Sequence, residues 1–220
     1  MKKFIIPAFL LIATLTEAQS SRPPLNFRTA FTFSPLHLLG PDFTFLPGVE
    51  YRIQPGTTLQ AELGWVFASA YIGSNSSSEA STKANGFMLR PSVKFYLNEQ
   101  KTFYVQPQLF YKMVTHHLSD WVDKNVVNGV GSYQEYEDFR YRRSIFGFNA
   151  IAGALVPLSR RNNSFFDFYI GFGARNKDGW IVDQPNSHYD GQGSFGRLEN
   201  VDHGTYPSIP GGARLVFMIK

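Results

Sequence analysis

Apolar and polar residues alternate along most of the chain, which is typical of β-strands that have two different faces. The clearest example is the segment 86–97, in which odd-numbered residues such as Leu89 and Val93 are apolar. The even-numbered residues between them, including Arg90 and Lys94, are mostly polar or amphipathic. This pattern predicts a strand with one apolar face and one polar face.

The same alternation predicts eight strands, at residues 26–34, 43–53, 58–71, 86–97, 102–115, 142–156, 164–175 and 211–219. Three of their connections are short and rich in Pro, Gly, Asn and charged residues, at residues 54–57, 98–101 and 159–163. Three others are long, at residues 72–85, 116–141 and 176–210, and the first, 35–42, is of medium length. Short turns at one end and long loops at the other are typical of outer-membrane barrels, whose tilted strands cross the membrane with about ten residues. The prediction is therefore an all-β fold: an eight-stranded antiparallel up-and-down transmembrane β-barrel with short periplasmic turns and long extracellular loops.

The N-terminal residues have the features of a secretory signal peptide. Two lysines precede an apolar stretch at residues 4–15, which is too short to span a bilayer as a helix. Thr16 and Ala18 provide a small-residue cleavage site. We therefore expect residues 1–18 to be removed during export and residues 19–220 to form the outer-membrane domain.

The composition excludes several classes of function. The net charge is only +4 and the basic residues are dispersed, so no basic stripe of the kind that binds nucleic acid is present. The chain has no cysteine, which excludes disulfides, cysteine-based metal sites and lipidation at a cysteine. An aromatic content of 16% with a mean hydropathy of −0.19 fits strands that are apolar on one face only.

One segment carries a resemblance to a known class of proteins. It is the strand at residues 43–53, with the sequence Phe-Thr-Phe-Leu-Pro-Gly-Val-Glu-Tyr-Arg-Ile, followed by a Pro-Gly turn and the strand from Leu59 to Trp65. It resembles the small outer-membrane β-barrels of Gram-negative bacteria, in the OmpA-like and OmpX-like class. The resemblance extends over nearly the whole predicted mature chain but rests on pattern. Many such barrels end in an aromatic residue, whereas this chain ends in Phe-Met-Ile-Lys.

If the apolar positions face lipid, a set of charged residues of mixed sign faces inward: Arg28, Glu50, Arg52, Glu62, Arg90, Lys94, Lys112, Asp167, Arg175 and Arg214. The interior of an eight-stranded barrel is only wide enough for side chains to fill it. Buried charges must be paired. We therefore expect a salt-bridged interior rather than an open pore, with no cofactor. Outward-facing Tyr51, Trp65, Tyr71 and Tyr111 lie near strand ends, where aromatic girdles form at membrane interfaces.

Candidate catalytic groups are few. His116 and His117 precede Asp120 and Asp123, a spacing that could offer imidazole and carboxylate to a metal or a general base. Other candidates in the last long connection are Ser187, His188, Asp190, Asp202, His203 and Ser208. Solvated loops explain all of them more simply. The Asp-Gly pairs at residues 178–179 and 190–191 predict hairpin turns rather than a phosphate-binding loop, because no helical pattern follows them.

Two prolines, Pro91 and Pro107, lie within adjacent predicted strands on the lipid-facing side. Proline lacks a backbone donor and therefore weakens a β-ladder. A simple bend is one interpretation, and a lateral opening toward the lipid is the other.

The sequence thus predicts a non-enzymatic outer-membrane protein, held by outer-membrane lipids, whose long loops contact an extracellular or envelope partner. Aromatic residues suitable for such contacts are Tyr133, Tyr136, Phe139, Trp180, Tyr189 and Tyr206. Two alternatives stay open: a lipid-modifying barrel enzyme that uses loop His, Asp and Ser residues, and a soluble lipocalin-like barrel. The latter requires an apolar interior, the reverse of the predicted arrangement.

Overall fold

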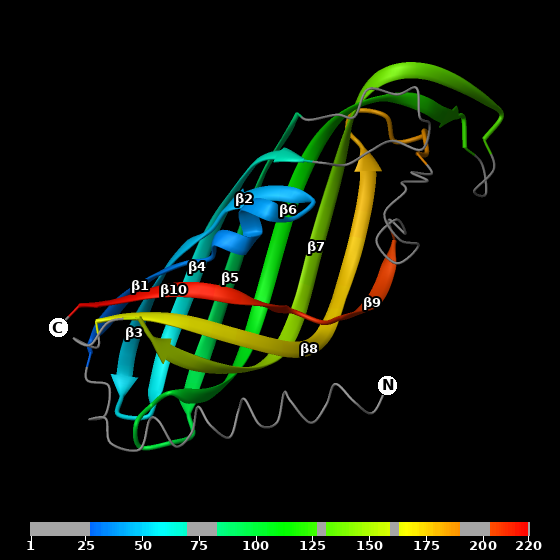
Figure 1. Ribbon diagram of the computed structural model, residues 1–220. Helices are drawn as coiled ribbons and strands as arrows, with labels where there is room; N and C mark the ends of the chain where they lie inside the picture. Colours follow the sequence, from blue (N-terminus) through cyan, green and yellow to red (C-terminus); the bar gives the residue numbers. More distant parts are fainter. Residues whose placement is uncertain (1–26, 70–82, 127–130, 159–162, 190–202, 220) are drawn as a thin grey trace, which may run out of the picture.

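The computed structural model describes residues 27–69, 83–126, 131–158, 163–189 and 203–219. Within them the chain is all-β apart from one short 3₁₀ helix, η1 (Pro35–Leu39) (Figure 1). No helix in this described part is long and apolar enough to span a membrane. The predicted signal peptide, residues 1–18, lies outside the described residues.

The strands are β1 (Thr29–Phe33), β2 (Asp42–Phe45), β3 (Pro47–Gln54), β4 (Thr57–Ser69), β5 (Ala84–Tyr96), β6 (Phe103–Lys124), β7 (Tyr133–Pro157), β8 (Ser164–Ile181), β9 (Gly204–Ser208) and β10 (Gly211–Ile219). They form one antiparallel sheet in the order β10-β1-β3-β4-β5-β6-β7-β8-β9. An additional pairing between β10 and β8 closes eight of these strands into a ring. The all-β class and the antiparallel eight-strand ring are therefore confirmed.

One of the predicted strands is divided into two segments, and β9 forms within the predicted connection at residues 176–210. The predicted strand at residues 43–53 becomes β2 and β3, which pair one after the other along β4. The ladder of β2 contains a bulge between Phe43 and Thr44, and β3 begins at Pro47, which has no backbone donor. β9 and β10 likewise lie one after the other along β8, separated by Ile209 and Pro210.

Three strands, β6, β7 and β8, are longer than predicted. β6 and β7 stay paired up to Lys124 and Tyr133, so most of the predicted loop at residues 116–141 is a β-ribbon. β8 continues to Ile181, and its Asp178 and Gly179 pair with β7. The predicted hairpin turn at this Asp-Gly pair is therefore wrong, because the extended β7 supplies ladder partners to these residues. The second Asp-Gly pair lies outside the described residues.

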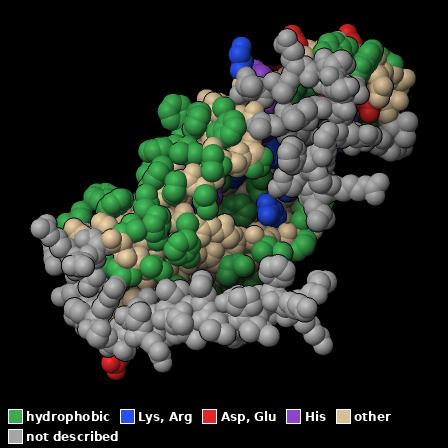
Figure 2. Space-filling model, viewed as in Figure 1, with side chains coloured by type: hydrophobic (Ala, Val, Ile, Leu, Met, Phe, Trp, Pro, Cys, Tyr) green, Lys and Arg blue, Asp and Glu red, His purple; other side chains and the backbone are tan. Residues whose placement is uncertain are grey.

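The two faces of the ring differ in polarity. Large apolar side chains with more than two-fifths of their surface exposed line its outside, among them Phe31, Val49, Leu59, Leu63, Trp65, Leu89, Leu109, Phe146, Phe148, Phe168, Ile170 and Phe172. Figure 2 shows hydrophobic side chains over much of the visible face, and the visible acidic side chains lie toward its ends. Charged and polar side chains are buried inside the ring, so groups capable of binding or catalysis are concentrated there.

Candidate functional site

The interior of the ring contains a cluster of three carboxylates and three cations. Lys94 on β5 pairs with Glu50 on β3 and, at 2.9 Å, with Asp167 on β8. Arg214 on β10 reaches Asp167 with its Nε at 3.1 Å. The Arg90 Nη2 to Glu62 Oε2 distance is 3.2 Å, and Glu62 lies 3.7 Å from Arg214. Two of these pairs, Glu62–Arg90 and Asp167–Arg214, join ladder partners on neighbouring strands. The others join strands that are not neighbours in the ring. Together the charges neutralise one another, as buried charges must.

Neutral polar groups complete this central cluster. The Arg214 guanidinium donates to Gln60 at 2.9 Å, to the Tyr104 hydroxyl at 2.9 Å and to Gln106 at 3.1 Å. The Tyr104 hydroxyl in turn donates to Asp167. A planar guanidinium with five donors suits this multiple bonding, because each N–H can meet a different acceptor. The cluster therefore fills the middle of the ring with bonded side chains.

A second ionic cluster lies further along the interior, around Asp42. The Asp42 carboxylate accepts from Lys112 at 2.6 Å, from Arg143 at 3.1 Å and from the Ser69 hydroxyl at 2.8 Å. The side chain of His37, on η1, lies between the two clusters in contact with Arg90 at 2.8 Å. η1 contacts both β2 and β10, so it covers the region above the short strand β1.

The structure places seven of the ten predicted inward charges in ion pairs: Glu50, Glu62, Arg90, Lys94, Lys112, Asp167 and Arg214. The other three residues, Arg28, Arg52 and Arg175, lie outside these two clusters. Arg28 is exposed and donates to the Tyr51 hydroxyl on the outer face, which differs from the prediction because Arg28 precedes β1 at the rim of the ring. Arg52 is half-buried with its guanidinium 4.2 Å from the centre of the Phe27 ring, and Arg175 is half-buried on β8 opposite Tyr206.

Sequence reasoning missed several members of the two clusters. Asp42 fell in a predicted connection, and Arg143 fell at the start of a predicted strand, so neither was assigned to a face. Tyr104 and Gln106 carry no charge, so a prediction based on charged residues does not include them. Their alternation with apolar residues on β6 was the available signal for their interior position.

The candidate catalytic residues do not converge. Because successive side chains of a strand point to opposite faces, His116 is buried inside whereas His117 is exposed. Asp120 accepts from Tyr189, and Asp123 accepts from Gln134 on the outer side. Among the described residues, no group of three His, Cys, Asp or Glu side chains could hold a metal.

The remaining candidates lie in the last long connection. His203 contacts Asp178 at 2.8 Å, and both are exposed. Ser208 is buried at the end of β9, and the backbone of His188 bonds to that of Asp123. Asp190 and Asp202 lie outside the described residues. The Ser, His and Asp side chains expected of a hydrolase are thus not brought together in the part that the structure describes.

The β6–β7 ribbon extends past the last residues that pair with β5 and β8. One of its faces is apolar and packs against the end of β8 and the segment that follows it. The buried side chains of this contact are Leu118, Val122, Phe139, Tyr141, Ile181 and Tyr189. The opposite face is exposed and carries the cross-strand pair Trp121 and Tyr136, whose ring centres are 5.7 Å apart. Near its tip, a hydrogen bond from Lys124 lowers the pKa of the Glu137 carboxyl below its ordinary value.

The two mid-strand prolines both affect the β5–β6 seam. In this register Pro91 stands opposite Leu109 and Pro107 opposite Val93, but neither pair is formed. Between Leu89 and Phe95, Ser92 is the one β5 residue with a ladder partner on β6. This pattern is what two missing donors on the same seam produce, since the carbonyls of Leu109 and Val93 lose the N–H groups that proline lacks.

Replacing both prolines with valine is expected to raise the free energy of unfolding by roughly 1 kcal/mol per restored hydrogen bond. Each valine supplies an N–H to a carbonyl that lacks one, and β-branched residues suit strands. Chemical denaturation measures the change, and amide hydrogen exchange should slow in residues 91–95 and 105–109. Unchanged stability and exchange in the P91V/P107V variant would reject the seam as a weak point and, with it, the lateral opening.

Comparison with known proteins does not assign the chain to a family. No protein-family model matches the chain, and no curated protein is significantly similar to it. The resemblance to small outer-membrane barrels therefore stays a prediction from the sequence pattern.

Proposed function

We propose that this protein is a non-conducting eight-stranded outer-membrane β-barrel whose long β6–β7 ribbon stands outside the membrane and contacts a partner. Its short turns would face the periplasm. The interior supports the non-conducting part of this proposal, because its charges are paired across the ring instead of lining an aqueous path.

The observation that carries the proposal is a reversal of the apolar face along β7. Near its middle, the outward residues are Phe146 and Phe148, which are 55% and 49% exposed. Further toward the ribbon tip, the residues on this same outward face are Arg140 and Asp138, whereas the inward Phe139 is buried. An apolar exterior suits lipid, and a polar exterior over an apolar interior suits water. The reversal therefore supports a membrane boundary near residues 140–146.

β6 has a matching change at the same level. Its outward residues change from Leu109 to His117 and Ser119, and its inward residues change from Gln108 to Leu118 and Val122. Two paired strands thus mark one boundary, which a fully soluble barrel has no reason to contain. A lipocalin-like protein also requires an apolar interior, and this interior is ionic.

The exposed face of the ribbon is the best candidate for a partner surface. Trp121 and Tyr136 are 51% and 53% exposed, and aromatic residues of this kind dominate many interfaces. The ribbon itself is held by its packed opposite face. An aromatic pair on a supported platform is suited to binding, whereas catalysis would need reactive groups that converge.

The proposal is tested by refolding the chain without residues 1–18 into detergent and lipid vesicles. We expect faster gel migration before heating than after it, and protease cleavage confined to the long connections. Planar bilayers containing the protein should show no steady conductance. A water-soluble, fully digestible product would contradict membrane insertion, and a stable conductance would contradict the sealed interior.

Orientation is tested with single cysteines, because the natural chain has none. A cysteine replacing Tyr136 on the ribbon should react with a membrane-impermeant reagent on intact Gram-negative cells. A cysteine replacing Gln100, in the short β5–β6 connection, should react only after the outer membrane is permeabilised. The opposite labelling pattern would reverse the proposed orientation.

A further inference from the structure

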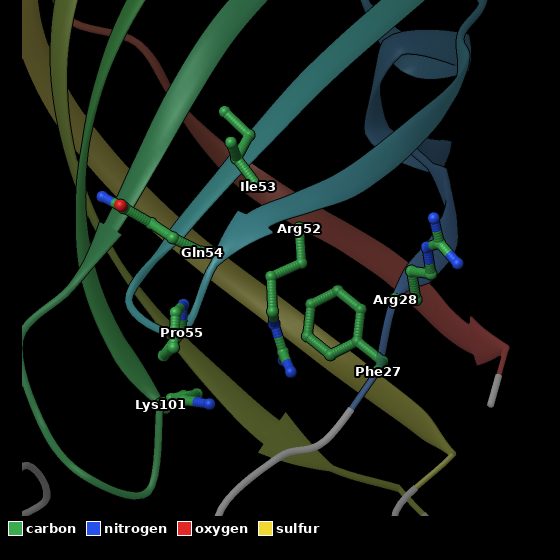
Figure 3. A pocket seen from close by; sticks show the side chains of 7 residues that line it. All are labelled: Phe27, Arg28, Arg52, Ile53, Gln54, Pro55 and Lys101. Carbon is green, nitrogen blue, oxygen red and sulfur yellow. The ribbon is translucent and has the colours of Figure 1, made fainter.

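The short-turn end of the ring contains a basic pocket that no other part of the proposed function uses. Its volume is about 660 Å³. It is lined by Phe27, Arg28, Arg52, Ile53, Gln54, Pro55 and Lys101 (Figure 3). All three charged side chains in this lining are cations, in contrast to the balanced clusters inside the ring.

Two of these cations, Arg52 on β3 and Lys101 in the β5–β6 turn, approach one another. The backbone N–H of Arg52, on β3, donates to the carbonyl of Arg28 at 2.9 Å, and its guanidinium lies 4.2 Å from the centre of the Phe27 ring. Figure 3 shows the side chain of Lys101, from the β5–β6 turn, reaching toward the end of Arg52. Burial, and then the charge of Arg52, lower the pKa of Lys101. Two cations are therefore held close enough to repel each other.

Lys101 is also held in an unfavourable backbone conformation. Its φ is 57°, in the left-handed region that residues with a side chain rarely adopt. The side chain of Asn98 fixes this turn by accepting from the backbone N–H groups of Thr102 and Phe103 at 2.9 and 3.0 Å. A glycine would fit this position without strain. The strained turn therefore fixes the charged side chain of Lys101 in the lining of the pocket, beside Arg52.

The third cation connects the pocket to the outer wall. Arg28 donates to the hydroxyl of Tyr51 at 3.2 Å, and Tyr51 is exposed on the lipid-facing side. Ile53, which also lines the pocket, is 56% exposed. The pocket therefore passes from a basic rim to an apolar wall, an arrangement that suits an anionic headgroup with hydrocarbon attached.

We propose that this pocket binds a phosphate group through Arg52 and Lys101, with Arg28 at its outer edge. Arginine and lysine are the usual protein ligands of phosphate, and guanidinium groups bond two of its oxygens at once. An anionic phospholipid of the adjacent leaflet and free phosphate share this chemistry. The lipid source rests on the proposed membrane location, whereas the phosphate site itself does not.

Two binding measurements on the folded protein in a neutral detergent distinguish these sources. The first titrates inorganic phosphate by calorimetry. The second uses native mass spectrometry to compare retention of phosphatidylglycerol with that of phosphatidylcholine. We expect binding in at least one arm: preferential retention of phosphatidylglycerol assigns the site to a lipid headgroup, and binding of inorganic phosphate alone assigns it to free phosphate.

The double variant R52Q/K101Q should weaken this binding about 100-fold, roughly tenfold for each lost cation. The control K83Q removes one exposed cation just before β5, at the other end of the strand, and should bind as the natural chain does. Binding by the natural chain should also weaken with rising salt. Binding in neither arm, or equal binding by R52Q/K101Q, would overturn the site.

The gel-migration assay separates this result from the test of the proposed function. If R52Q/K101Q keeps its heat-modifiable migration and loses binding, the barrel is intact and the site is supported. If the natural chain binds phosphate but fails to insert into vesicles, the membrane proposal fails while the site stands.

Discussion

Replacing Asp167 with alanine is expected to lower the free energy of unfolding by about 3–5 kcal/mol, the usual cost of breaking a buried ion pair. Asp167 is fully buried, accepts hydrogen bonds from Lys94 and Tyr104, and forms an ion pair with Arg214. Its loss leaves two buried cations sharing fewer carboxylates, so the interior acquires an uncompensated positive charge. Urea denaturation of the refolded protein in detergent measures the change.

Three further variants test this explanation. D167N keeps the shape and one acceptor, so it should fold even if D167A does not and should lose less stability. Adding K94M to D167A restores the charge balance and should recover part of the loss, which a double-mutant cycle detects. D183A removes the partner of Arg140 from an exposed ion pair and should cost at most about 1 kcal/mol. Equal losses for D183A and D167A would contradict a buried ionic interior.

The alternation of side chains made the ring predictable. Each strand of the ring has apolar residues on one face, so the pattern identified the strands and the polar positions of Lys94, Asp167 and Arg214 together. It could not show which strands lie opposite one another across the ring. The contact of Lys94 with both Glu50 and Asp167 joins residues far apart in sequence, and only the closed topology brings them together.

The ribbon was missed because its pattern is inverted. Leu118, Val122 and Phe139 are apolar on the inward face, whereas the strands in the middle of the ring are apolar on the outward face. A prediction that expects apolar residues only at outward positions therefore interprets residues 116–141 as a loop. The basic pocket could not be predicted either, since Arg52 on β3 and Lys101 in the β5–β6 turn are far apart in the sequence, and the left-handed conformation of Lys101 has no glycine to signal it.

The inversion leads to the second large expected effect, a difference between two matched substitutions on β7. Phe148 and Tyr136 lie on the same outward face and are 49% and 53% exposed. If the membrane covers the level of Phe148, F148R should lower the free energy of unfolding in lipid vesicles by about 2–4 kcal/mol, because a charge then faces hydrocarbon. Y136R lies on the ribbon and should change it by less than about 1 kcal/mol, the usual range for exposed surface substitutions. Denaturant titration in vesicles measures both. A soluble barrel would present both side chains to water, so equally small effects would contradict the membrane location and leave the exposed phenylalanines without an explanation.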